Sequence, residues 1–208
     1  MSTEKEKQTR EIYDSRSYEW LEYSGGKDRA CFWQEEMSSF LDHLGQGKKV
    51  LEVGCGPATD GKYLLGGGCR DVVSIDYSSG MLKMAREILP PASGRPDLCQ
   101  MDAYHLGFSP ESFDGFWATA VFVHLADPEV SLNEIHRVLK PAGYGLISVK
   151  EGQGERIDQR TGYYFHDYPG SGPGNFPSIL SETGFQVVES GVRQYPGRNW
   201  LTYLVQKK

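Results

Sequence analysis

The sequence predicts a doubly wound α/β fold, in which a mostly parallel sheet of seven strands carries helices on its two faces. Between residues 48 and 150, short apolar runs alternate with helical stretches of about 10–15 residues, a pattern typical of βαβ units. Near the end of the chain, two extended runs flank a turn at 196–199. Such a pair indicates an antiparallel hairpin added to the sheet.

The length of 208 residues favours a single domain (1–208). Within it we distinguish three parts by their patterns. They are an N-terminal helical cap (1–47), a core with the alternating elements (48–150), and a loop followed by the final hairpin (151–208).

Composition and charge limit the classes of partner that the protein is expected to bind and the cellular compartment in which it is expected to act. The chain has 22 Lys and Arg against 28 Asp and Glu, a net charge of −6, which argues against duplex nucleic acid as a partner. No stretch approaches the roughly 18 apolar residues of a membrane span, and the polar N-terminus lacks the apolar run of a signal peptide. The four cysteines form no CxxC pair. We therefore expect a cytoplasmic protein with reduced thiols and no bound metal.

The N-terminal part is expected to be helical before the first strand. Residues 1–10 are charged and expected to be frayed, whereas the apolar positions within 30–44 fit one helical face. Gly45 and Gly47 end this helix, and the apolar run at 48–55 predicts the first strand.

Helices and strands then alternate. A helix leaves the first strand and stops at three successive glycines, 66–68. Further strands are predicted at 71–76, 98–102, 113–120 and 144–150. The helices between them are predicted at 78–89, with Ser78 or Ser79 as N-cap, and at 128–142, with Asp127 as N-cap and Gly143 after its end.

The last third is richer in glycine. Residues 151–174 hold six glycines around an aromatic cluster at 162–168, and a short helix at 176–183 follows. The extended runs at 185–195 and 199–206 form the predicted hairpin.

A glycine turn between the first strand and its helix carries the strongest local signal. In VLEVGCGPATDG (50–61), Gly54 allows a sharp turn and Gly56 lets a ligand approach the backbone at the helix N-terminus. The dinucleotide fingerprint G-x-G-x-x-G would need a third glycine where this chain has Thr59. A tight turn without a ligand remains an equally good interpretation of this motif alone.

Two carboxylates at the ends of neighbouring strands favour a ligand-binding turn over a tight turn without a ligand. Asp76 ends the second strand 22 residues after Gly54, a spacing at which doubly wound folds bind ribose hydroxyls. Asp102 ends the third strand, where it could reach an adenine amino group. The alternatives are a helix cap for Asp76 and a turn former for Asp102.

Glu52 distinguishes between adenosine cofactors. It lies in the first strand, two residues before the glycine turn, where a buried acid is costly unless it is paired. A pyrophosphate would be repelled there, which disfavours NAD. S-adenosylmethionine has an ammonium, a sulfonium and no phosphate, and it suits an acidic rim.

Four segments, taken in order, resemble the motifs of class I S-adenosylmethionine-dependent methyltransferases. They are VLEVGCGPATDGKYL, SIDYSSGMLKMAR, MDAYHLGFSPESFDGFWATAVFVHL and EIHRVLKPAGYGLISVKEGQGE. The similarity covers about residues 48–150 and is that of a methyltransferase type 11-like domain, while the tail is similar to bacterial small methyltransferases. Ala58 stands where many members have a third glycine. The resemblance implies the Rossmann-like methyltransferase fold, with S-adenosyl-L-methionine as cofactor and S-adenosyl-L-homocysteine as product.

The resemblance also implies roles for individual residues around the cofactor. Residues at the methionine end are Glu52, Gly54 and Gly56. Asp76 holds the ribose, and the adenine meets Tyr77, Met81, Asp102 and Ala103. Ala118 and Thr119 run along the sulfonium side. Asp60 caps the helix after the glycine turn, with binding of the cofactor's ammonium as the lesser alternative.

Catalytic and acceptor-binding candidates are fewer and each has a structural alternative. His124, just beyond the fourth strand, is either a general base or a loop histidine packed on the next helix. His166 could face the acceptor from the aromatic cluster or be a lid or surface residue. Candidate acceptor-binding residues are Tyr163, Tyr164, Phe165, Lys150 and, in the N-terminal cap, Tyr13 and Tyr18; packing of rings or surface charge explains each equally well.

The function that these features favour is methyl transfer to an O, N or C atom of a small-molecule acceptor. A tRNA wobble-uridine methyltransferase is the enzymatic alternative, because YYFHDY (163–168) and GRNW (197–200) loosely resemble that group. A non-catalytic, S-adenosylmethionine-binding regulatory protein is the third possibility. We expect a monomer or homodimer.

Overall fold

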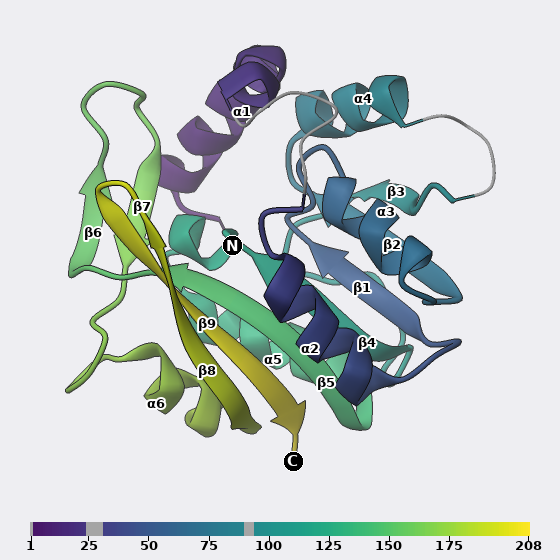
Figure 1. Cartoon of the computed structure of the whole chain (residues 1–208). Coiled ribbons are helices and arrows are strands. Elements are labelled where there is room, and N and C mark those ends of the chain that lie inside the picture. The colour runs from purple at the N-terminus through teal and green to yellow at the C-terminus, as the bar shows by residue number, and fades with distance from the viewer. Residues whose placement is uncertain (1, 24–30, 90–93) are drawn as a thin grey trace.

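The computed structural model describes residues 2–23, 31–89 and 94–208. Its main sheet has seven strands in the order β3-β2-β1-β4-β5-β9-β8. The strands are β1 (Lys49–Val53), β2 (Asp71–Asp76), β3 (Asp97–Gln100), β4 (Phe113–Thr119), β5 (Leu139–Lys150), β8 (Phe185–Tyr195) and β9 (Arg198–Lys207). The first five pair in parallel, whereas β9 is antiparallel to β5 and β8 is antiparallel to β9. The predicted doubly wound fold with a C-terminal hairpin is confirmed (Figure 1).

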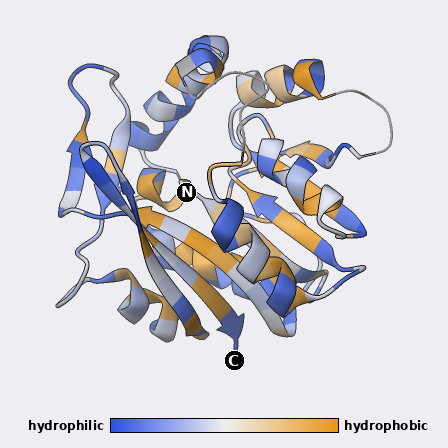
Figure 2. Cartoon of the chain, in the orientation of Figure 1, coloured by the Kyte–Doolittle hydropathy of each residue, from blue (hydrophilic) through white to orange (hydrophobic). Residues whose placement is uncertain are grey.

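Helices cover both faces of this sheet. They are α1 (Glu4–Tyr23), α2 (Gln34–Leu44), α3 (Thr59–Gly66), α4 (Ser79–Ile88), α5 (Pro128–Val138) and α6 (Phe176–Glu182). Apolar side chains of α2 and α3 pack with Val50 of β1 on one face, and those of α5 and α6 pack with Leu51 on the other. Because neighbouring residues of a strand point to opposite faces, β1 is buried on both sides, and the central strands hold much of the hydrophobic colour in Figure 2.

Three expectations about elements were wrong. Residues 4–10 belong to the helix α1 and are not frayed. The aromatic cluster contains a strand, β7 (Tyr164–Asp167), which pairs antiparallel with β6 (Gly154–Ile157) in a small second sheet. The helix predicted at 128–142 is shorter, because α5 ends at Val138. Leu139 already belongs to β5 and pairs with Phe113 of β4, and the register shifts before the next pair of these strands.

Helix α1 is largely polar and docks on α4 through hydrogen bonds as well as through Leu21, which packs on Met81 and Met84. Its Asp14 carboxylate accepts from the Ser78 hydroxyl (2.7 Å) and from the Gly80 backbone N–H (2.8 Å) at the start of α4. A methyl group at position 80 would lie 2.4 Å from the Asp14 carbonyl oxygen. Gly80 therefore permits the close approach that holds α1 over the carboxyl ends of the strands.

We expect Gly80→Ala to displace α1 while the rest of the fold persists. The overlap falls on backbone atoms and cannot be relieved by a side-chain rotation, so the helices must separate. Limited trypsin digestion should then cut at Arg10 and Arg16 several-fold faster than in the wild type. Gly66→Ala is the matched control, because a methyl group there meets nothing within 4 Å; equal digestion rates of the two variants would contradict this account of docking.

Candidate functional site

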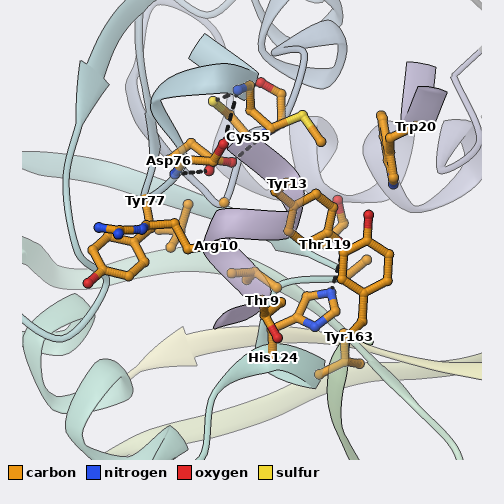
Figure 3. Close-up of a pocket in the computed structure, with 18 of the residues that line it drawn as sticks. Thr9, Arg10, Tyr13, Trp20, Cys55, Asp76, Tyr77, Thr119, His124 and Tyr163 are labelled. Carbon is orange, nitrogen blue, oxygen red and sulfur yellow. Dashed lines mark hydrogen bonds between the residues drawn. The ribbon is translucent and has the colours of Figure 1, made fainter. Parts of the chain in front are cut away.

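A large cavity lies at the carboxyl ends of the parallel strands, with a volume of about 940 Å³. Its floor includes the ends of β1, β2 and β4, and α1 lies across it. Segments from β6–β7 and β8–β9 complete the wall. Figure 3 shows Asp76 and Cys55 on one side of this cavity and Tyr163, His124 and Tyr13 on another. Open α/β sheets bind ligands at this edge.

The glycine turn forms one end of the cavity. Gly54 has a φ of 64°, and a methyl group there would lie 2.4 Å from the Val121 side chain. Gly56 has a φ of 52° and open space where a side chain would be. Ala58, where the related motif has a third glycine, also has a left-handed φ of 54° and precedes α3.

Asp76 joins the glycine turn to the loop after β2. Its carboxylate accepts from the backbone N–H groups of Gly56 and Ser78, each at 2.8 Å. Burial raises the pKa of Asp76 to about 6, although both hydrogen bonds oppose that shift. Since a carboxylate has about four lone-pair sites, two remain for a ligand. Ser78, not Asp76, provides the cap of α4, accepting from Met81 N–H.

Asp102 lies on the same side, just after β3. Its carboxylate accepts from the Tyr104 backbone N–H (2.9 Å), as expected for a turn former, and from the Ser2 hydroxyl (2.8 Å). Asp102 and Ala103 both line the cavity, as do Tyr77 and Met81. The segment before α1 thus reaches across the cavity to the end of β3.

Glu52 lies beneath the start of α3 and is almost fully buried. It accepts from the Gly61 backbone N–H (3.1 Å) and pairs with the Ser74 hydroxyl. Burial, followed by the nearby Asp60, raises the pKa of Glu52 to about 8. Asp60 does not cap α3 as predicted; its carboxylate accepts from the Trp117 indole and the Thr119 hydroxyl, both at 3.1 Å.

We expect Glu52→Gln to stabilise the ligand-free protein relative to the wild type as pH rises. The folded-state pKa of about 8 lies above the ordinary 4.5, so the folded chain holds a proton that the unfolded chain has released between these values. The wild-type free energy of unfolding therefore falls as pH rises from about 5 to 8, whereas glutamine has no proton to lose. Urea unfolding at pH 5.5, 7 and 8.5 measures the difference, and a constant difference would contradict a protonated Glu52.

Tyr13 and His124 form a hydrogen-bonded pair in the cavity. The Nδ1 of His124 lies 2.7 Å from the Tyr164 carbonyl oxygen, and because a carbonyl only accepts, Nδ1 carries the proton. Nε2 is then an acceptor, and the Tyr13 hydroxyl donates to it at 2.9 Å. Burial lowers the pKa of His124 to about 4, so the imidazole is neutral at physiological pH.

Some predicted residues lie outside the cavity wall. Ala118 points into the hydrophobic core, because it alternates with Thr119 along β4. Tyr18 is 48% exposed and bonds to Glu87 on the surface. Neither side chain meets the cavity in this structure.

The aromatic cluster is also divided by the alternation along β7. Tyr163 and Phe165 line the cavity, whereas Tyr164 is fully buried behind it. His166 stacks on Tyr168 with ring centroids 4.5 Å apart. Lys150 pairs with Asp167 (3.7 Å) away from the wall.

Several wall residues had no role in the sequence-based prediction. Arg10 stacks on Tyr77, 5.0 Å from its ring centroid. Other such residues are Thr9, Arg16, Phe32, Trp33, Tyr195, Arg198 and Trp200. The aromatic and basic character of most of these residues was visible in the sequence. Only the folding of three distant segments brings them together in one wall.

Two further features of the described residues bear on ligand type. In residues 2–23, 31–89 and 94–208, no three His, Cys, Asp or Glu side chains gather as metal ligands would. Within the same ranges, no helix has the length and apolarity that crossing a bilayer requires.

Comparisons with known proteins agree with the fold. Residues 51–147 match the model of a methyltransferase domain. A malonyl-(acyl-carrier protein) O-methyltransferase of Erwinia billingiae is 32% identical over 123 residues, which cover 59% of this chain and 46% of that protein. The chain spans between 39% and 46% of the length of three such curated relatives.

Solved structures share the architecture at low identity. A Burkholderia thailandensis 1,6-didemethyltoxoflavin-N1-methyltransferase, solved with 1,6-didemethyltoxoflavin and S-adenosylhomocysteine, has a TM-score of 0.76 and 20% identity over 96% of this chain and 87% of its own. The (4+2)-cyclase SpnF has a TM-score of 0.73 and 18% identity over 96% of each chain. The family-model match, together with the curated relatives, identifies residues 51–147 as a methyltransferase domain.

Proposed function

We propose that the protein binds S-adenosyl-L-methionine and transfers its methyl group to a small-molecule acceptor. The observation that carries this proposal is one cavity that joins the carboxylates at the ends of β2 and β3 to the Tyr13–His124 pair. A methyl donor and an acceptor need such a shared space, because the reacting atoms must meet within it.

The residues at the first end fit the cofactor. Asp76 has lone pairs left for the two ribose hydroxyls, and Tyr77 and Met81 offer apolar surface for the adenine beside Asp102 and Ala103. Gly54 and Gly56 leave room for the methionine part against the backbone, near Glu52 and Asp60. An ammonium bound here would favour the ionised form of Glu52, whose pKa is raised in the ligand-free protein, whereas a pyrophosphate would be repelled by it.

The second end supplies the acid–base chemistry. When bound, the cofactor supplies a methyl group that is already activated for displacement, so the protein has mainly to align the acceptor. An acceptor O–H or N–H placed at the Tyr13 oxygen can give up its proton there, while Tyr13 passes its own proton to His124 Nε2. The resulting imidazolium is stabilised by the Tyr164 carbonyl at Nδ1 and by the nearby Asp167.

Binding and turnover assays test the proposal separately. S-adenosylhomocysteine at 100 times its dissociation constant should add about 2.7 kcal/mol to the free energy of unfolding, and NAD should add nothing. Turnover is then assayed against phenols, aromatic acids, amines and bulk tRNA with labelled cofactor. Methylation of a small molecule supports the proposal. Methylation of tRNA alone replaces it with the RNA function, and binding without turnover of any substrate favours a non-catalytic protein.

A further inference from the structure

The end of the cavity that we assign to the acceptor differs in chemistry from the end at the glycine turn, which we assign to the cofactor. Four of the cavity-lining acids, Glu52, Asp60, Asp76 and Asp102, belong to the β1–β3 side or to α3, whereas Glu6 and Glu19 lie on α1 and Asp158 follows β6. On the opposite side, the segment before α2 and the β8–β9 hairpin contribute Phe32, Trp33, Tyr195, Arg198 and Trp200. This second group is aromatic and carries positive charge.

The rings of this group form a continuous apolar wall. Phe32 and Trp33 meet edge to face with centroids 4.7 Å apart, and Trp33 meets Trp200 in the same way at 5.7 Å. Phe32 also contacts Tyr195 at 5.8 Å. Trp200 is partly buried and Tyr195 is exposed, so ring surface remains for a flat ligand.

Arg198 is the polar group within this wall. Its guanidinium lies over the Tyr195 ring, 4.7 Å from the centroid, and its buried Nε has no hydrogen-bond partner. Among the described residues, no acid pairs with it: Glu151, on the neighbouring strand, accepts instead from the Asn199 amide at 2.8 Å. A buried guanidinium nitrogen without a partner is costly, and an anionic ligand would remove that cost.

Other charges near the acceptor end leave this positive charge uncompensated. Lys150 and Arg156 both pair with Asp167, and Arg156 also lies 3.8 Å from Asp158. Arg198 helps to lower the pKa of Lys150 after the larger effect of burial. Asp158 is occupied by Thr161 and by the Arg160 backbone. Glu19 lines the cavity from α1, on the same helix as Arg16.

The position of Arg198 separates it from the cofactor. It begins β9, and two strands, β4 and β5, lie between β9 and β1. At about 4.8 Å per strand, Arg198 is roughly 14 Å across the sheet from the glycine turn. The methionine part of a cofactor at Gly54 and Gly56 does not span that distance, so the guanidinium faces the acceptor.

We propose that the methyl acceptor is a flat aromatic compound with an acidic group, its ring packed among Phe32, Tyr195 and Trp200 and its anion paired with Arg198. This inference rests on the proposed function, because it identifies the second ligand of the same cavity. A guanidinium binds a carboxylate through two parallel hydrogen bonds, and the adjoining rings bind an aromatic body. A cationic aromatic ligand would meet repulsion from the same group.

Three probes of equal shape test the charge preference. In the presence of saturating S-adenosylhomocysteine, 2-naphthoate, 2-naphthamide and 2-naphthylmethylammonium are titrated by calorimetry. We expect naphthoate to bind about tenfold to one-hundredfold more tightly than the amide, as for hydrogen bonds to a charged group. Equal affinities, tighter binding of the ammonium, or no binding of naphthoate at millimolar concentration would each overturn the inference.

Variants assign the preference to Arg198. Arg198→Gln should reduce the acid-to-amide ratio to about one and leave S-adenosylhomocysteine affinity within about twofold of the wild type. Arg70→Gln is the matched control, since Arg70 is exposed and pairs with Asp71 at the start of β2; it should keep the full ratio. A ratio that persists in Arg198→Gln also overturns the inference. If S-adenosylhomocysteine itself fails to bind the wild type, the proposed function fails instead, so the two failures are distinguishable.

Discussion

Asp76→Asn should remove most of the stabilisation that S-adenosylhomocysteine confers on the wild-type protein. The variant loses the charged acceptor for two ribose hydroxyls, and each such bond contributes roughly 1.5–3 kcal/mol. A dissociation constant about 100-fold higher is therefore the minimum that we expect. At a concentration 100 times the wild-type constant, the ligand-induced stabilisation would fall from about 2.7 to about 0.4 kcal/mol.

Asparagine is chosen so that the variant keeps the fold and only the ligand contact is tested. Asp76 also accepts from the backbone of Gly56 and Ser78, and the asparagine side chain retains one acceptor oxygen for them, which alanine lacks. Asp71→Asn, at the other end of the same strand and exposed, is the control and should keep the wild-type shift in melting temperature. A normal shift in Asp76→Asn would exclude this carboxylate from the ligand site.

Tyr13→Phe should lower kcat by about 10²–10⁴, the range for positioned acid–base groups, for an acceptor that must lose a proton. The substitution removes one oxygen, the one that donates to His124 Nε2 at 2.9 Å. The affinity for S-adenosylhomocysteine should change little, because the Tyr13 hydroxyl is occupied by His124. Tyr18→Phe is the matched control on the same helix, since its hydroxyl lies on the surface beside Glu87.

The titration of His124 provides a readout that a merely structural role would not move. In the wild type, NMR should give His124 a pKa of about 4, lowered by burial. Loss of the donor to Nε2 removes a bond that favours the neutral ring, so the pKa should rise in Tyr13→Phe, and the acid limb of the pH–rate profile should move to higher pH. Unchanged turnover in both Tyr13→Phe and His124→Gln would reduce the pair to a contact that holds α1 in place.

Much of the fold and of the proposed cofactor site could be predicted because the determining interactions are local. The turn at 54–56 requires a left-handed backbone, and the sequence indicates it through Gly54 and Gly56, which adopt that conformation without strain. The strand ends that place Asp76 and Asp102 follow from apolar runs of the chain itself. Parallel strands bring their carboxyl ends to one edge of the sheet. The pairing of Glu52 with Ser74 on β2 therefore agrees with the strand order that the sequence already predicts.

The acceptor end could not be predicted in the same way, because it is assembled from distant segments. Tyr13 and His124 are 111 residues apart, and Arg198 meets the cavity only through the pairing of β9 with β5. Period-two alternation along β7 decides that Tyr163 and Phe165 face the cavity while Tyr164 is buried behind it, but the predicted loop carried no such period. Likewise, the largely polar helix α1 docks on α4 both through the Asp14 carboxylate at the Gly80 N–H and through Leu21, which packs on Met81 and Met84, and neither contact is visible in the sequence.

The sequence by itself therefore determined the order of elements, the parallel sheet and the carboxylates at its strand ends, because hydrophobic period and turn chemistry act over a few residues. Only the tertiary structure decided which aromatic and basic side chains share the cavity, which tautomer His124 holds and where α1 lies. Those depend on contacts between residues far apart in the chain, and packing and hydrogen-bond geometry select among alternatives that the sequence leaves equal.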